Sequence, residues 1–147
     1  MNMAPEVSSR TSRYLGLAAA YERAATLLFE NGGAAQSPAP YFHIVAHAFE
    51  LCLKGVIARG HCDDEHLMAL GHDLSFCLRL ALDKGLSLGD SAPTVEGVVN
   101  ALSHGHHGQS YRYPTLFRLA PPSAESALLA LQVTLRAAAE LSEARPK

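Results

Sequence analysis

One stretch, YFHIVAHAFELCLKGVIAR at residues 41–59, constrains the fold of this chain more than any other. It is long enough for about five helical turns. Apolar side chains point in nearly every direction around such a helix, and a helix that is apolar almost all round is normally buried at the centre of a protein. The sequence therefore predicts a central helix with the rest of the chain packed around it.

This helix carries one polar stripe, because His43, His47, Glu50 and Lys54 fall within a narrow arc at 100° per residue. Glu50 precedes Lys54 by four residues, the favourable order for a helical ion pair. On a solvated face such a pair contributes only about 0.3–0.5 kcal/mol. The alternative is a partly buried polar seam that needs partners from other segments.

The composition favours one all-α domain. The chain has 147 residues, of which 48% are hydrophobic, and this is enough for a single core. Alanine and leucine dominate while β-branched residues are sparse, which favours helix over strand. We predict a flexible N-terminal tail at residues 1–9, a helical domain at 10–143 and a C-terminal tail at 144–147.

Capping residues and glycines divide the domain into helices. Ser9 or Thr11 is the expected cap of a first helix that ends near residue 30, and Asp73 and Ser123 are expected to cap the third and last helices. A fourth helix is expected from Pro93 to residues 104–105, and a short helical turn at residues 65–69. The prediction is an antiparallel up-and-down bundle of four long helices plus one shorter helix.

Charge and cysteine content bear on location and partners. A net charge of −2 and the lack of a basic recognition helix make DNA an unexpected partner. Cys52, Cys62 and Cys77 are odd in number and lack CxxC spacing, as expected for free thiols in a reducing cytoplasm. We find no signal-peptide pattern and no apolar run approaching about 20 residues, so we expect a cytoplasmic protein without a membrane span.

Two further segments carry polar groups that suit binding. Gly71-His72-Asp73 opens the third helix, where Asp73 suits a cap and His72 is placed to reach back to Glu50. Tyr111-Arg112-Tyr113-Pro114 places an arginine between two aromatic rings, an arrangement suited to bidentate binding of a phosphate or carboxylate. An ordinary structural bridge between Arg112 and Glu50 is the alternative.

A metal site is another alternative for the polar stripe. His43 and His47 are four residues apart, a spacing that places two imidazoles on one ion, and Glu50 follows one turn later. A further ligand would come from His104, His106 or His107. No second Glu-x-x-His supports a di-iron centre, so we expect no cofactor unless purified protein retains zinc, iron or nickel. The sequence also lacks a nucleophile elbow, a Walker motif and a dinucleotide-binding glycine pattern.

The run HAFELCLKGVI, then GHDL at a helix start, then YRYP, resembles HEPN domains in order and spacing over about residues 10–142. HEPN domains are nucleotide-binding domains of higher eukaryotes and prokaryotes. The resemblance implies a bundle of four to five helices, often homodimeric and commonly encoded beside, or fused to, a nucleotidyltransferase. Many members are RNases of toxin–antitoxin, antiphage or stress systems.

RNase members of that family use an Arg-x4-6-His motif, and here only Arg59 and His66 match it formally. That match spans Gly60 and a polar loop and lacks the polar residue that usually follows the arginine, so we interpret it as chance. The chain therefore resembles the non-nucleolytic branch. By resemblance, the residues of a phosphate-binding site or of a structural clasp are Glu50, Lys54, His72, Asp73, Arg112 and Tyr113.

Two functions of different class follow from these features. The first is a HEPN-like binding module without catalysis, a homodimer that binds a nucleotide, an RNA phosphate or a partner protein near Lys54, His72 and Arg112. The second is a divergent, metal-independent endoribonuclease in which His72, with His106 or His107, acts as acid or base and Arg112 holds phosphate.

Overall fold

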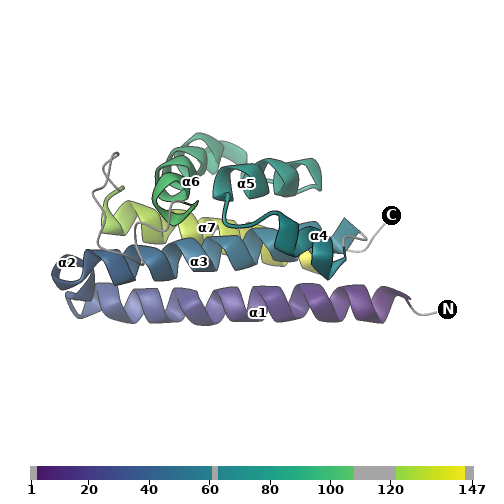
Figure 1. The fold of residues 1–147 in the computed structure, drawn as a ribbon, viewed down its shortest axis with the longest axis horizontal. Coiled ribbons are helices and arrows are strands. Elements are labelled where there is room, and N and C mark those ends of the chain that lie inside the picture. The colour runs from purple at the N-terminus through teal and green to yellow at the C-terminus, as the bar shows by residue number, and fades with distance from the viewer. Residues whose placement is uncertain (1–2, 61–62, 108–121, 145–147) are drawn as a thin grey trace.

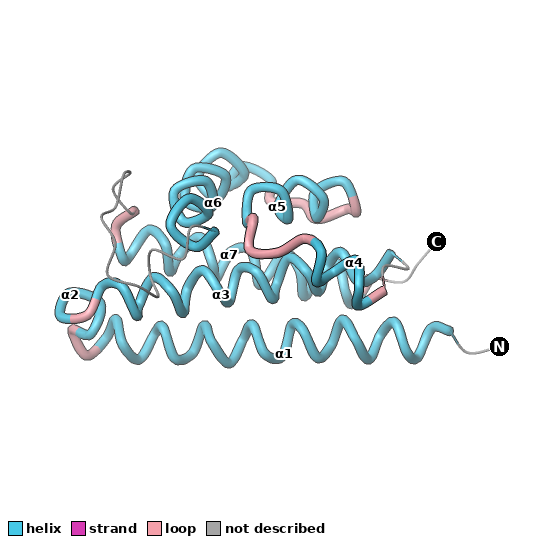
Figure 2. The backbone as a smooth tube through the Cα atoms, viewed as in Figure 1, coloured by secondary structure: helices cyan, strands magenta, loops and turns pink. Residues whose placement is uncertain are grey.

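The computed structural model describes residues 3–60, 63–107 and 122–144, and this part of the chain is helical and contains no strand (Figures 1 and 2). The all-α prediction is confirmed. The helices are α1 (Met3–Glu30), α2 (Gly33–Gln36), α3 (Pro38–Ile57), α4 (Asp64–Ala69), α5 (Leu74–Asp83), α6 (Ala92–His107) and α7 (Ala124–Glu143), with 3-10 turns η1 (Ala58–Gly60) and η2 (Gly89–Ser91).

Helices α1, α3 and α7 run along the long axis of the molecule (Figure 1). The start of α1 meets the end of α3, where Thr11 bonds to Gly55, so these two helices are antiparallel. The starts of α3 and α7 meet instead, where Tyr41 bonds to Ala124, so α7 is parallel to α3. Helices α5 and α6 pack on α3 away from α1, and α6 runs at a steep angle to the long axis.

Helix α3 is the buried centre that the sequence predicts. Tyr41, Val45, Phe49 and Leu53 are fully buried, and α1, α5, α6 and α7 all pack against this helix. It begins at Pro38, where a proline in the first turn costs no hydrogen bond. The expectation that no apolar run approaches the length of a membrane span is wrong, because the segment Pro38–Gly60 is long and apolar enough for one. Of the most apolar window in that segment, 83% is buried inside the fold.

Helix α1 starts at Met3, before the cap that the sequence predicts at Ser9 or Thr11. Pro5 lies in its first turn, where proline is tolerated. Thr11 lies inside the helix and is 2% exposed, and its hydroxyl donates to the carbonyl of Gly55 at 3.1 Å. A tertiary partner for the hydroxyl, 44 residues away in sequence, replaces the local capping bond that the sequence pattern suggested.

Gly55 allows the close approach of α1 and α3 at this point. A Cβ atom at Gly55 would lie 3.1 Å from Leu15 Cδ2 and 3.1 Å from Tyr14 Cβ. We expect Gly55→Ala to lower the free energy of unfolding by about 1–3 kcal/mol, because overpacking forces the two helices apart. Urea unfolding measures the change. The matched control is Gly97→Ala in α6, where a Cβ meets nothing within 4 Å and the higher helix propensity of alanine should leave stability equal or raised.

Capping side chains mark the starts of α4 and α7. Asp63 caps α4 and accepts from the backbone N–H of His66 at 2.8 Å, a bond that holds the pKa of the Asp63 carboxyl below its ordinary value. Ser123 caps α7 as predicted and accepts from the N–H of Ser126.

Helix α6 continues through Gly105 to His107, so the predicted stop at residues 104–105 is wrong. A glycine inside a helix costs only about 1 kcal/mol, and the helix can absorb this cost.

Candidate functional site

The carboxylate of Glu50 on α3 is the centre of the polar residues that the structure brings together. Its Oε2 accepts from Nζ of Lys54 at 3.1 Å, and its Oε1 lies 2.7 Å from Nδ1 of His72. Glu50 is 5% exposed and Lys54 is 8% exposed. These two residues are therefore not on a solvated face. We refer to Glu50, Lys54 and His72 as the buried clasp.

Local backbone geometry delivers His72 to the clasp. Gly71 ends the α4 turn with a φ of 61°, a left-handed conformation that glycine adopts without strain. Asp73 follows His72 and caps α5, so the backbone is fixed on both sides of His72. The ring spans from the α5 start to α3 and remains 41% exposed. The predicted contact between His72 and Glu50 is present.

Asp73 belongs to a different contact network from the clasp. Its Oδ1 accepts from the N–H of Phe76 at 3.0 Å and from the hydroxyl of Ser103 at 3.4 Å. The Ser103 hydroxyl in turn accepts from the N–H of Ser75, and Ser75 Oγ donates to Asn100 Oδ1 at 2.7 Å. This network ties the start of α5 to α6. Asp73 therefore acts as a cap and a link between helices.

Ser103 is a buried polar residue that the sequence analysis missed. It is 6% exposed and lies on the face of α6 that buries Val95, Val99 and Leu102. Its position four residues after Val99 was a usable signal, because a polar residue at apolar helical spacing needs a partner inside the protein. The identity of that partner was not readable, since Asp73 lies 30 residues earlier.

The histidine half of the α3 stripe faces α1. The His43 and His47 rings stack with centroids 6.2 Å apart, and the Tyr21 ring meets His47 edge-on at 4.8 Å. Among the described residues, no three His, Cys, Asp or Glu side chains are grouped to hold a metal ion. The side chains of the other proposed ligands lie outside the described part of the structure; these are His104, His106 and His107.

The predicted arginine partner cannot be placed with the clasp. Arg112 and Tyr113 both lie in residues 108–121, outside the described part of the chain. The contact between Arg112 and Glu50 therefore stays a prediction. Within the described residues, each Glu50 oxygen already has a cationic or imidazole partner, from Lys54 and His72.

The buried thiols nearby are chemically quiet. Burial raises the pKa of Cys52 to about 12 and that of Cys77 to about 11. Lys54 lowers the Cys77 pKa by a smaller amount, while Glu50 and Asp73 raise it. A thiol with so high a pKa carries almost no thiolate at neutral pH, and the thiolate is the reactive form. Neither cysteine is a nucleophile candidate.

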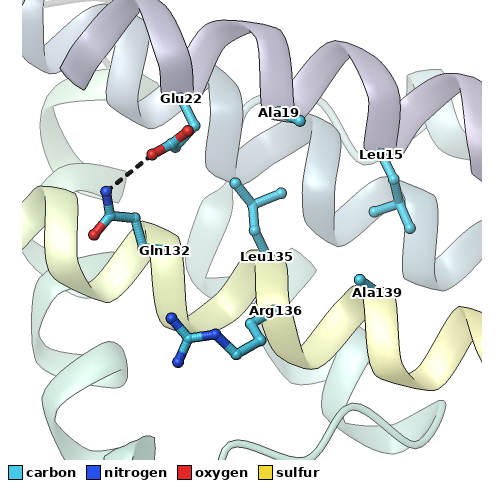
Figure 3. Close-up of a pocket in the computed structure, with 7 residues that line it drawn as sticks. All are labelled: Leu15, Ala19, Glu22, Gln132, Leu135, Arg136 and Ala139. Carbon is cyan, nitrogen blue, oxygen red and sulfur yellow. Dashed lines mark hydrogen bonds between the residues drawn. The ribbon is translucent and has the colours of Figure 1, made fainter. Parts of the chain in front are cut away.

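Two cavities in the described part of the molecule lie away from the clasp. One of about 340 Å³ lies between α1 and α7, lined by Leu15, Ala19 and Leu135 with Glu22, Gln132 and Arg136 at its rim (Figure 3). The other, of about 170 Å³, lies between α5 and α6 and includes Arg79 and Glu96. Neither is lined by Glu50, Lys54 or His72.

Comparison with known proteins gives no match: no family model, no curated protein and no solved structure is similar to this chain. The chemistry available to the site therefore follows from its geometry. The clasp holds a compensated ion pair in α3 and fixes an imidazole at the start of α5. It can act as a structural link or orient His72 for proton transfer.

Proposed function

We propose that this protein is a HEPN-like helical interaction module, which works by binding protein surfaces and has no catalysis of its own. Its partners are a second copy of the chain and a protein of the nucleotidyltransferase or toxin–antitoxin and defence type. Of the residues that the family resemblance associates with phosphate binding, Glu50, Lys54 and His72 serve here to hold α3 against the start of α5.

One observation carries this proposal: the ammonium group of Lys54 is buried and already paired with a carboxylate. A phosphate at Lys54 would have to displace Glu50 at 3.1 Å, in a position where the lysine is only 8% exposed. Removing one partner of a buried ion pair leaves an uncompensated charge and costs about 3–5 kcal/mol. Phosphate binding would have to overcome that cost, whereas protein binding by an outer surface leaves the clasp intact.

NMR titration distinguishes protein binding from phosphate binding. Labelled protein is titrated with ATP and separately with a short single-stranded RNA, and the His72 ring and the α3 amides around Lys54 are followed. We expect no saturable shift at these positions. A saturable shift at His72 that Lys54→Ala abolishes would replace the protein-binding proposal with a phosphate site.

The divergent RNase is the second candidate, and one observation favours it. His72 lies 2.7 Å from a buried carboxylate and is still 41% exposed, as expected for an imidazole positioned for acid–base chemistry. RNA incubated with purified protein in a chelator tests it. If the protein is an RNase, cleavage should disappear in both His72→Ala and Arg112→Ala while circular dichroism stays unchanged. Cleavage that survives both changes belongs to a contaminant or to other residues of the chain.

A further inference from the structure

The outer face of α1 carries a narrow apolar stripe, in which three residues are exposed and one, Ala24, is half-buried. Leu17 is 54% exposed and Leu27 is 61% exposed, and Ala20 and Ala24 lie between them on the same face. Figure 1 shows α1 at one edge of the molecule, with the other helices on one side of it. We refer to Leu17, Ala20, Ala24 and Leu27 as the α1 seam.

The spacing of the α1 seam is that of a helix-pairing surface. Leu17 and Ala24 are seven residues apart, and so are Ala20 and Leu27; this heptad spacing is the one at which two helices stay in contact along their length. The inward face of α1 is separate, since Ala18 and Ala25 are fully buried and lie on a different side of the helix. The seam is therefore additional to the residues that hold α1 in its own fold.

The seam is also symmetric about its centre. Read in either direction it is leucine, alanine, alanine, leucine with the same spacing. A twofold axis near residue 22 places Leu17 of one copy against Leu27 of the other, and Ala20 against Ala24. Surfaces that pair with themselves in this way are the requirement for a closed dimer. The two alanines at the centre let the helix axes approach closely, within about 8–10 Å.

Charges at the ends of the seam favour the same antiparallel pairing. Arg13 lies one turn before Leu17 on the same face and is exposed. In the antiparallel arrangement it reaches the last turn of the other copy, where Glu30 is exposed and the helix end is itself negative. A parallel arrangement would instead place the two copies of Arg13 side by side.

The groove between α1 and α7 is a weaker candidate because its own side chains bridge it. Figure 3 shows Gln132 on α7 donating to Glu22 on α1, at 2.9 Å, and Thr26 also donates to Glu22. A partner that enters this groove would have to break these hydrogen bonds to Glu22. A partner that binds the α1 seam would leave them intact.

We infer that the α1 seam is a self-association surface, on which two copies of this chain pair through antiparallel α1 helices. This inference rests on the proposed protein-binding function and names one of its surfaces. The seam spans about 15 Å, since ten residues rise 1.5 Å each. An interface of this length buries less surface than permanent dimer interfaces do. We therefore expect a weak dimer that exchanges with monomer.

Sedimentation velocity over a range of protein concentrations measures the dimer directly. We expect the wild type to shift from monomer to dimer as concentration rises. Leu17→Glu and Leu27→Glu should each raise the dissociation constant about tenfold or more, because each change buries two carboxylates in the symmetric interface. Leu129→Glu is the matched control: this α7 leucine is also 54% exposed and lies outside the seam, so the change should have no effect.

Cysteine cross-linking tests the orientation. Ala20→Cys and Ala24→Cys are made separately in a Cys62→Ser background, in which Cys52 and Cys77 remain buried. Under mild oxidation, a mixture of the two variants should form a disulfide faster than either variant alone, because residue 20 faces residue 24 of the other copy. Disulfides that form equally fast in each variant alone would overturn the antiparallel pairing.

The outcomes separate this inference from the proposed function. A wild type that stays monomeric at all concentrations overturns the seam and the second copy as a partner, and leaves binding of a different protein standing. A dimer that survives both glutamate variants, or that is lost in Leu129→Glu, overturns the seam alone. A phosphate shift at His72 in the NMR titration would overturn the proposed function without affecting the dimer.

Discussion

Glu50→Ala is expected to lower the free energy of unfolding by about 3 kcal/mol, because it leaves the buried Lys54 ammonium without its carboxylate. The His72 ring loses its partner in the same change. Urea unfolding monitored by circular dichroism measures the effect. The matched control is Glu96→Ala on α6, an exposed glutamate, where stability should move by less than about 0.5 kcal/mol.

A double variant separates the charge effect from lost packing. Glu50→Leu combined with Lys54→Met replaces the ion pair with apolar side chains of similar size, and such replacements are often neutral or stabilising. We expect the double variant to be clearly more stable than Glu50→Ala. If Glu50→Ala were no more destabilising than Glu96→Ala, the carboxylate would be solvated in solution and the clasp would not hold the fold.

Tyr41→Ala is expected to cost about 3–5 kcal/mol, as for other large buried aromatic side chains. Tyr41 is 0% exposed, and its hydroxyl donates to the carbonyl of Ala124 at 2.8 Å, which joins the start of α3 to the start of α7. Tyr41→Phe keeps the ring and removes only the hydrogen bond, so we expect a loss of about 1 kcal/mol. Phe29→Ala is the control. Phe29 is 37% exposed, so its loss should lower the free energy of unfolding by less than Tyr41→Ala does.

The Tyr41 variants also predict a pH dependence. Burial raises the pKa of Tyr41 from 10.0 to about 12. Folding therefore favours the neutral phenol, and this contribution is complete below pH 10 and lost as pH rises through 12. The stability gap between wild type and Tyr41→Phe should narrow over that range, measured by unfolding at several pH values. A gap that widened with pH would contradict a buried, neutral Tyr41.

Local signals determined a large share of the fold from sequence. The continuous apolar character of residues 41–59 predicted a central helix, and α3 is that helix. Asp73 and Ser123 cap α5 and α7 as predicted, because a cap depends on a side chain and a backbone N–H only three residues apart. Information of such short range is contained in the sequence itself.

The tertiary structure decided the environment of the polar groups. Sequence showed that Glu50 and Lys54 are neighbours on one helix face, but a solvated stripe and a buried seam have the same spacing. The burial of that face depends on His72, 22 residues away, and on the helices that follow it. By its residue type, Thr11 could cap the start of a helix or lie within one. It lies within α1, where its hydroxyl donates to the carbonyl of Gly55 on α3. Sequence thus determined which helices form and which residues share a face, whereas packing determined which faces are shielded from water, because burial depends on contacts between distant segments.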